Sequence, residues 1–137
     1  MVAEKKLEQK KSQPQPKNNT QLASLAHLSF LTILIIGPFS MVIPLIIWLL
    51  ERNKSDKSSF VEFQSKQAFF YQLAIYLITA VLGILVGILS IIIIGLLFIP
   101  LLILFPIVAV IYGVYAGIQV WNGIEFRYIY IADFIEA

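Results

Sequence analysis

The feature that most constrains this chain is an uncharged stretch from Ala68 to Gln119, 52 residues that contain no Asp, Glu, Lys, Arg or His. As a single helix this stretch would extend about 78 Å, well beyond the ~30 Å hydrocarbon core of a bilayer. The stretch must therefore fold back on itself. Gly95 and Pro100 lie near its middle and supply residues suited to a turn. The sequence predicts a membrane hairpin with spans at about 68–92 and 101–119.

The composition agrees with a polytopic membrane protein, since 59% of the 137 residues are hydrophobic and only 13% are charged. The chain has no Cys, which excludes disulfides, thiolate nucleophiles and Cys-ligated metals. The formal net charge is +2, and the basic residues flank the apolar segments instead of gathering on one folded face. Nucleic-acid binding is therefore not expected.

A second hydrophobic region, residues 22–50, is interrupted at Gly37–Pro38 and again at Pro44. Proline inside a helix removes a hydrogen bond and clashes with the preceding turn. The two pieces, 22–36 and 41–50, would extend about 22 Å and 15 Å, which is short for full spans. Basic residues favour the cytoplasmic side and are dense on both flanks of this region. We therefore expect a broken helical hairpin that enters and leaves from one side. The sequence leaves open whether it reaches the far interface or is re-entrant.

Together these patterns predict an all-α integral membrane domain at residues 21–123, built from two helical hairpins with four membrane helices. Residues 1–20 are rich in Lys and are expected to form a disordered arm, with a secretory signal as the competing interpretation. Residues 124–137 are expected to form an interfacial tail, extended or helical. The uncharged turn near Gly95 is expected on the external side and both termini in the cytoplasm. Residues expected at the interface are Trp48, Trp121, Arg127, Tyr112, Tyr115 and Tyr128.

Two small-x-x-x-small patterns, Gly83–Gly87 and Gly113–Gly117, lie inside the apolar spans. Glycines at this spacing clear a helix face, so that another backbone can approach closely in lipid. With the turn centred near residue 98, Gly83 and Gly113 lie at the same depth. We expect these two faces to pack against each other; a homodimer face and chance occurrence of glycine are the alternatives.

His27 is the only histidine of the chain. A lone imidazole can relay protons or ligate a haem or metal, but one ligand does not make a site. With no Cys and no acidic residue inside a span, a structural hydrogen bond is the favoured interpretation, and Gln72 is a second candidate for a polar contact. No cofactor and no metal are expected.

Enzyme activity is not expected. The serines have no spaced His and Asp partners, no phosphate loop or zinc pattern occurs, and no carboxylate pair lies in a span. Autonomous ion transport is disfavoured because His27 is the only ionisable group of the spans.

Four short segments, in this order, resemble a known family: Leu25–Ser29, Ile43–Ser55, Phe60–Ala68 and Trp121–Tyr128. Together they are similar to the Tic-twenty-like family of small prokaryotic membrane proteins, named for a remote similarity to a component of the chloroplast inner-envelope import machinery. The resemblance covers about residues 22–135. It implies a four-helix domain in a prokaryotic cell inner membrane and supplies no reaction.

The function expected from these observations is that of a non-enzymatic multi-pass membrane protein. Such a protein would act as an accessory or scaffold subunit that packs against membrane-protein partners, or as a homo-oligomer, with the lipid bilayer as its surroundings. The alternative, which follows from the resemblance, is a component of a protein import or translocation system.

Overall fold

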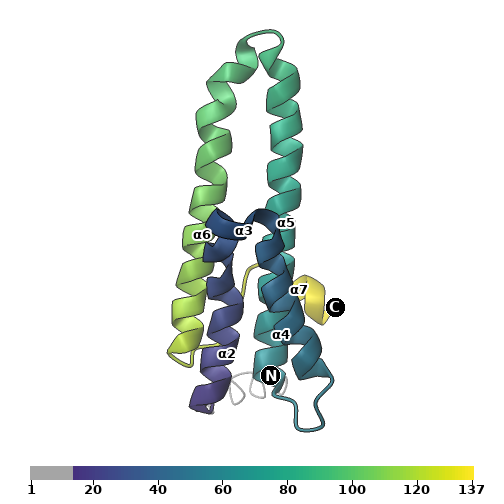
Figure 1. Ribbon diagram of the computed structural model, residues 1–137, viewed down its shortest axis with the longest axis vertical. Coiled ribbons are helices and arrows are strands. Elements are labelled where there is room, and N and C mark those ends of the chain that lie inside the picture. Colours follow the sequence, from purple (N-terminus) through teal and green to yellow (C-terminus); the bar gives the residue numbers. More distant parts are fainter. Residues whose placement is uncertain (1–13) are drawn as a thin grey trace, which may run out of the picture.

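The computed structural model describes residues 14–137, and over this range it contains helices, turns and irregular segments but no strand (Figure 1). The helices are α2 (Lys17–Leu28), η1 (Ser29–Thr32), α3 (Ile33–Ile36), η2 (Gly37–Met41), α4 (Val42–Arg52), α5 (Ser59–Ser90), η3 (Ile94–Phe98), α6 (Ile99–Trp121) and α7 (Ile131–Glu136). The predicted all-helical class is confirmed. Of the predicted arm at 1–20, residues 1–13 lie outside the described residues, and helix α2 begins at Lys17.

Helix α5 is one unbroken helix of 32 residues. It begins at a side-chain cap, because the Ser58 Oγ accepts a hydrogen bond from the Val61 backbone N–H at 3.3 Å. Glu62 in the first turn also favours the helix N-terminus electrostatically. The amphipathic start therefore continues directly into the apolar span, and the helix begins nine residues before the predicted span at Ala68.

The turn between α5 and α6 lies at residues 91–98 and overlaps the predicted turn at Gly95–Pro100. Ile93 has a φ of 68°, which is a left-handed backbone conformation. A side chain on Gly95 would collide with the backbone of Leu89 and Ser90, so only glycine fits at this close approach. Helix α6 starts with Pro100 in its first turn, where proline is tolerated, and continues through Pro106.

Residues 17–52 form a second, shorter hairpin, called here the short hairpin. Its direction reverses across η1, α3 and η2, where Gly37 has a φ of 58°. Helices α2 and α4 have only 12 and 11 residues, or about 18 Å and 17 Å.

By length and composition three segments of the described chain are able to cross a membrane: Lys17–Arg52, Ser59–Ser90 and Ile94–Trp121. The predicted count of four membrane helices is not confirmed, because the first of these segments is a bent pair of short helices.

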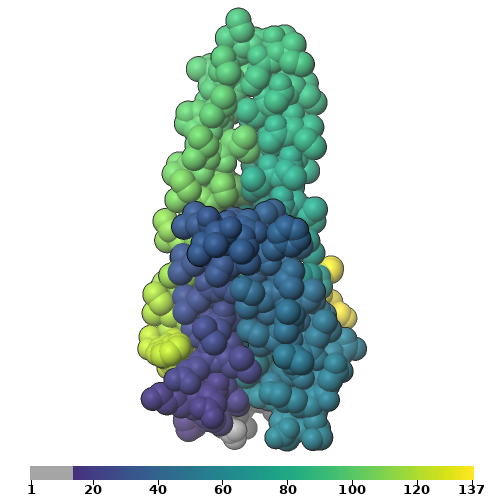
Figure 2. Space-filling model, in the orientation of Figure 1, coloured from purple at the N-terminus to yellow at the C-terminus, as the bar shows by residue number. Residues whose placement is uncertain are grey.

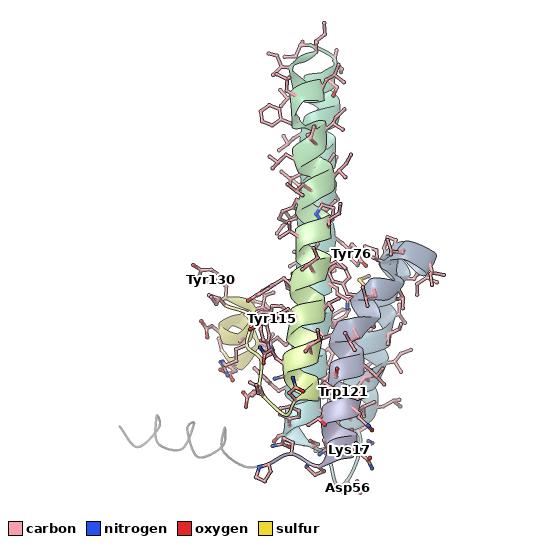
Figure 3. The ribbon with its side chains drawn as sticks, turned by 90° about the vertical axis from the view of Figure 1, so that its left-hand side faces the viewer. Lys17, Asp56, Tyr76, Tyr115, Trp121 and Tyr130 are labelled. Carbon is pink, nitrogen blue, oxygen red and sulfur yellow. The ribbon has the colours of Figure 1, made fainter. Side chains whose placement is uncertain are left out.

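The short hairpin covers only part of the long α5–α6 hairpin (Figures 1 and 3). Helix α2 packs against both α5 and α6, whereas α4 packs mainly against α5. The tail, residues 124–137, lies on the opposite side of the long hairpin (Figure 3). We call 59–76 of α5 and 109–121 of α6 the lower half, and 77–108 the upper half. Figure 2 shows that the molecule is broad where the short hairpin covers the lower half and narrow at the upper half.

The buried apolar residues lie in the lower half, the short hairpin and the tail. One cluster contains Phe30, Tyr71, Ile75, Ala109, Ala116 and Tyr128, and a second contains Ala23, Phe60, Val61 and Val120. The upper half instead exposes aliphatic side chains on both helices, among them Ile84, Ile88, Ile103 and Ile107. The core therefore occupies one end of an elongated molecule.

Candidate functional site

A buried polar network centred on His27 joins α2, α5 and the tail. The imidazole Nε2 lies 3.0 Å from Gln64 Oε1 and Nδ1 lies 3.2 Å from the Tyr128 hydroxyl. The Gln64 amide nitrogen donates to the Phe126 carbonyl at 3.0 Å, which directs its Oε1 toward His27. In a neutral imidazole Nε2 therefore donates to Gln64 and Nδ1 accepts from Tyr128. Both ring nitrogens are thereby occupied.

Two glutamines of α5 hold the backbone of the tail. Gln67 donates from Nε2 to the Phe126 carbonyl at 2.7 Å, and its Oε1 accepts from the Tyr128 N–H at 2.6 Å. Gln64 lies one turn earlier on the same face and donates to the same carbonyl. The tail has no strand or helix at these positions, so the glutamine side chains satisfy backbone groups that would otherwise be buried without partners.

The Tyr128 ring fills the space between α5 and α6. It stacks on Tyr71 with ring centroids 4.0 Å apart and an angle of 6°. The Tyr71 hydroxyl donates to the Ala109 carbonyl of α6 at 2.7 Å. Tyr112 and Phe126 contact the Tyr128 ring edge-to-face. Burial raises the pKa of Tyr128 well above its usual value, so this hydroxyl stays protonated. The predicted place of Tyr128 at the interface is therefore corrected: its side chain is 2% exposed and inside the bundle.

A second polar group fastens the tip of the short hairpin to the middle of α5. Gln72 donates to Ser29 Oγ at 3.2 Å and accepts from Ser40 Oγ at 3.3 Å. Ser40 also forms a hydrogen bond with the Tyr76 hydroxyl, which lies 3.5 Å from the Gly37 carbonyl. The polar atoms of the reversal thus point toward α5, and Ser40 itself is fully buried.

The loop between α4 and α5 is closed by Glu51, a carboxylate with 3% of its surface exposed. It accepts hydrogen bonds from Lys54 Nζ and from the Ser58 backbone N–H, both at 2.6 Å. Asn19 of α2 donates to Ser58 Oγ at 3.1 Å and brings the start of the short hairpin to the same place. These contacts fix the polar end of the molecule, where Figure 3 labels Lys17 and Asp56.

The glycine pairs occupy different surroundings. A Cβ on Gly113 would lie 3.0 Å from Phe30 Cδ1, and one on Gly117 would lie 2.8 Å from Leu28 Cγ. The absence of a side chain at these two glycines therefore lets the short hairpin pack closely against α6. A Cβ on Gly83 or Gly87 would meet no heavy atom within 4 Å. The expected packing of Gly83 against Gly113 is not formed, since a Cβ on Gly83 meets no heavy atom and the atoms nearest a Cβ on Gly113 belong to Phe30 and Tyr71.

The interfacial candidates Trp48, Trp121 and Arg127 lie in α4, at the end of α6 and in the tail. Trp48 stacks on Phe69, and the Lys66 ammonium lies 5.7 Å from its ring centroid. Trp121 is half exposed at the end of α6. Arg127 forms a bidentate pair with Glu136 at 2.9 Å and 2.6 Å, and this hydrogen bonding raises its pKa.

Sequence reasoning singled out His27 and Gln72 but missed their partners. The sequence pattern predicted no role in the site for Gln64, Gln67 or Glu51, and it placed Tyr128 at the interface. The one available signal was the spacing of residues 64, 67 and 72, which places three glutamines along one side of α5. Among residues 14–137 no three His, Asp or Glu side chains lie close enough together to hold a metal ion.

Comparison with known proteins identifies the family. The model of the magnetosome magnetite crystal formation protein family matches residues 18–135, a range that includes every residue of the His27 network. No curated protein and no solved structure matches the chain. The predicted Tic-twenty-like resemblance is therefore wrong, and the import role that followed from it has no support. With its long apolar helices the chain is a membrane protein, and it belongs to the magnetosome magnetite crystal formation protein family.

Proposed function

We propose that this chain is a non-enzymatic, multi-pass structural subunit of the membrane in which magnetite crystals form. The observation that carries the proposal is that the buried polar side chains form hydrogen bonds with other parts of the same chain. His27 binds Gln64, and Gln64 and Gln67 bind the backbone of the tail, so the hydrogen-bonding groups of these side chains are used to join segments of the chain. The family description supplies the link to magnetite.

The proposed arrangement places both termini and the loop at residues 53–58 in the cytoplasm. Lys17 lies at the end of the molecule that holds Asp56 of this loop (Figure 3), and Arg52, Lys54 and Lys57 lie in or next to the loop, whereas the turn at residues 91–98 carries no charge. The membrane is the prokaryotic cytoplasmic membrane or one derived from it. In this arrangement α2, α4, α5 and α6 each begin or end at the cytoplasmic surface.

The role in crystal formation is tested by complementation. The full chain is expressed in a magnetite-forming bacterium that lacks its own member of this family, and crystal size and number are measured by electron microscopy. Crystal size and number are expected to become closer to those of the bacterium that has its own family member. A Gln67→Leu variant, which removes the hydrogen bonds of Gln67 to the Phe126 carbonyl and the Tyr128 N–H, is expected to reach the membrane and restore less. Full-length protein that inserts normally and leaves the crystals unchanged contradicts the proposed role.

The arrangement in the membrane is tested separately by single-cysteine labelling, because the chain has no native Cys. A reagent that does not cross lipid is expected to reach cysteines at Asn18, Ser58 and Ala137 from one side and a cysteine at Leu97 from the other. Labelling of Asn18 and Ser58 from opposite sides would overturn the arrangement.

The subunit role is tested by purification from native membranes in mild detergent. The expected particle contains either a companion protein or more than one copy of the chain. A strictly monomeric particle with no companion would contradict a scaffold role and leave the membrane arrangement untouched.

A further inference from the structure

Distances along helices α5 and α6 give the depth of other residues in the bilayer, because each helical residue adds about 1.5 Å. On α5 the last charged residue is Lys66, and the distance from Ala68 to Ser90 is about 33 Å. Helix α6, Ile99–Trp121, has a similar length of about 33 Å. Both values match the ~30 Å hydrocarbon thickness of a bilayer. The long hairpin is therefore long enough to cross once in each direction with its polar end at one surface and residues 91–98 at the other.

Measured along these helices, the contacts of the short hairpin's tip lie about 12 Å from the polar end, a little short of half-way. Tyr76, whose hydroxyl lies 3.5 Å from the Gly37 carbonyl, is about 12 Å along α5 from Ala68. Gly113, against which Phe30 packs, is also about 12 Å from Trp121 along α6. Figure 1 shows α3 beside the middle of the long hairpin. Two independent contacts thus place the reversal near the bilayer midplane.

The surface of the tip is suited to hydrocarbon. Leu34, Ile35 and Phe39 are 87%, 86% and 74% exposed. The polar atoms of the same reversal turn inward, with Ser40 fully buried against α5. A tip at an aqueous interface would carry polar groups outside, as the loop between α4 and α5 does at Asp56 and Lys57. Lipid chains are the occupant that this surface favours.

The tail exposes further apolar side chains in the leaflet that holds the short hairpin. Ile129, Tyr130 and Phe134 are 74%, 83% and 70% exposed, beside the ion pairs of Arg127. A short segment with apolar side chains next to charged ones is typical of the membrane interface. The lower half is thus surrounded by α2, α4 and the tail, whereas the upper half consists of α5 and α6 with their turn (Figure 2).

We propose that the short hairpin is re-entrant and that, with the tail, it forms a wedge in the leaflet on the side of the termini. The wedge spreads the lipids of this leaflet and leaves the other leaflet nearly undisturbed. A bilayer that curves with this leaflet on its convex side relieves the mismatch. The protein therefore binds preferentially to strongly curved membranes and stabilises them. The partner is a lipid surface of defined curvature, and the proposal goes beyond the role in crystal formation.

The first experiment measures depth. Nitroxide labels are placed by Phe39→Cys, Leu97→Cys and Ser58→Cys in full-length protein reconstituted in bilayers, and their collisions with oxygen and with a polar nickel chelate are compared. The Phe39 position is expected to be the most accessible to oxygen and the least to nickel, with Leu97 at one interface and Ser58 in water. A Phe39 label at the depth of Leu97 means a full crossing. A Phe39 label shielded from both reagents means that protein covers the tip. Either result overturns the wedge.

The second experiment measures curvature preference. The Ser58→Cys protein is reconstituted into phosphatidylcholine–phosphatidylglycerol vesicles of mixed diameter and labelled from outside, so that only molecules with the broad end outward are counted. Their density is expected to be several-fold higher on vesicles of about 50 nm than on those of about 400 nm. Ile129→Ala with Phe134→Ala is expected to weaken this preference, whereas the matched pair Ile84→Ala with Ile88→Ala in the upper half leaves it unchanged. Equal density at all diameters overturns the proposal.

Discussion

The lower and upper halves of the α5–α6 hairpin are equally helical but are held in place by different interactions. In the lower half, buried side chains of Gln64, Gln67 and Gln72 bind other segments, and Gly117 admits α2. In the upper half, Gly83 and Gly87 have open space in front of them. In lipid, apolar surface contributes little to the association of helices, so close packing and hydrogen bonds determine how the helices are arranged. The position of the short hairpin is specified only where these are present.

The comparison is tested most strongly by one substitution made in each half. Gly117→Leu places a Cβ 2.8 Å from Leu28 Cγ and 3.3 Å from His27 Cβ, and we expect it to cost about 3 kcal/mol because the core has no room for it. Gly87→Leu meets nothing within 4 Å and is expected to change stability by less than about 0.5 kcal/mol. Reversible unfolding in mixed micelles, followed by Trp48 and Trp121 fluorescence, measures both. Equal effects would show that the halves do not differ.

The next largest effect is expected from His27→Leu. It removes the partner of Gln64 Oε1 and of the Tyr128 hydroxyl, both in the interior, and we expect a loss of about 2–3 kcal/mol. The matched control is Ser90→Ala in the upper half, which removes only a local hydrogen bond of 2.7 Å to the Val86 carbonyl. This control is expected to cost less than about 0.5 kcal/mol in the same unfolding measurement.

Tyr128→Phe separates the hydroxyl of this residue from its ring. It removes the hydrogen bond to His27 Nδ1 and keeps the stacking on Tyr71, so the expected loss is about 1 kcal/mol. A double-mutant cycle with His27→Leu measures the coupling, and the double variant is expected to be no less stable than His27→Leu alone. Strictly additive losses would mean that the two side chains do not interact.

The smallest effect is expected for Thr79→Val in the upper half. The Thr79 hydroxyl oxygen is buried and has no hydrogen-bond partner, so a methyl group in its place is neutral or stabilises by up to about 0.5 kcal/mol. The corresponding polar deletion in the short hairpin, Ser40→Ala, breaks contacts to Gln72 and Tyr76 and is expected to cost about 1 kcal/mol. A larger loss for Thr79→Val than for Ser40→Ala would reverse the comparison.

The long hairpin was predictable because its causes are local. The uncharged run from Ala68 to Gln119 exceeds one bilayer crossing, and Gly95 and Pro100 mark the turn. Gly37–Pro38 similarly marked the reversal of the short hairpin. The depth of that reversal was not predictable, because contacts of Ser40 with Gln72 and Tyr76 on another helix set it.

The hydrogen-bond partners of His27 could also not be predicted from sequence patterns. His27 is 37 residues from Gln64 and 101 residues from Tyr128, and periodicity relates only positions within one element. The alternation of polar and apolar residues in the tail indicated an extended segment. It did not show that Phe126 and Tyr128 enter the bundle, because this depends on the glutamines of α5 that receive them.

The placement of Tyr128 has a consequence for biosynthesis. Translation delivers the short hairpin to the membrane first, whereas the hydroxyl that pairs with His27 is made 101 residues later. Until Phe126 and Tyr128 have been made, His27 Nδ1 and the amide groups of Gln64 and Gln67 that bind the tail lack their partners. Assembly of this domain is therefore completed only after the segment with Phe126 and Tyr128 has been delivered, and this segment closes the bundle.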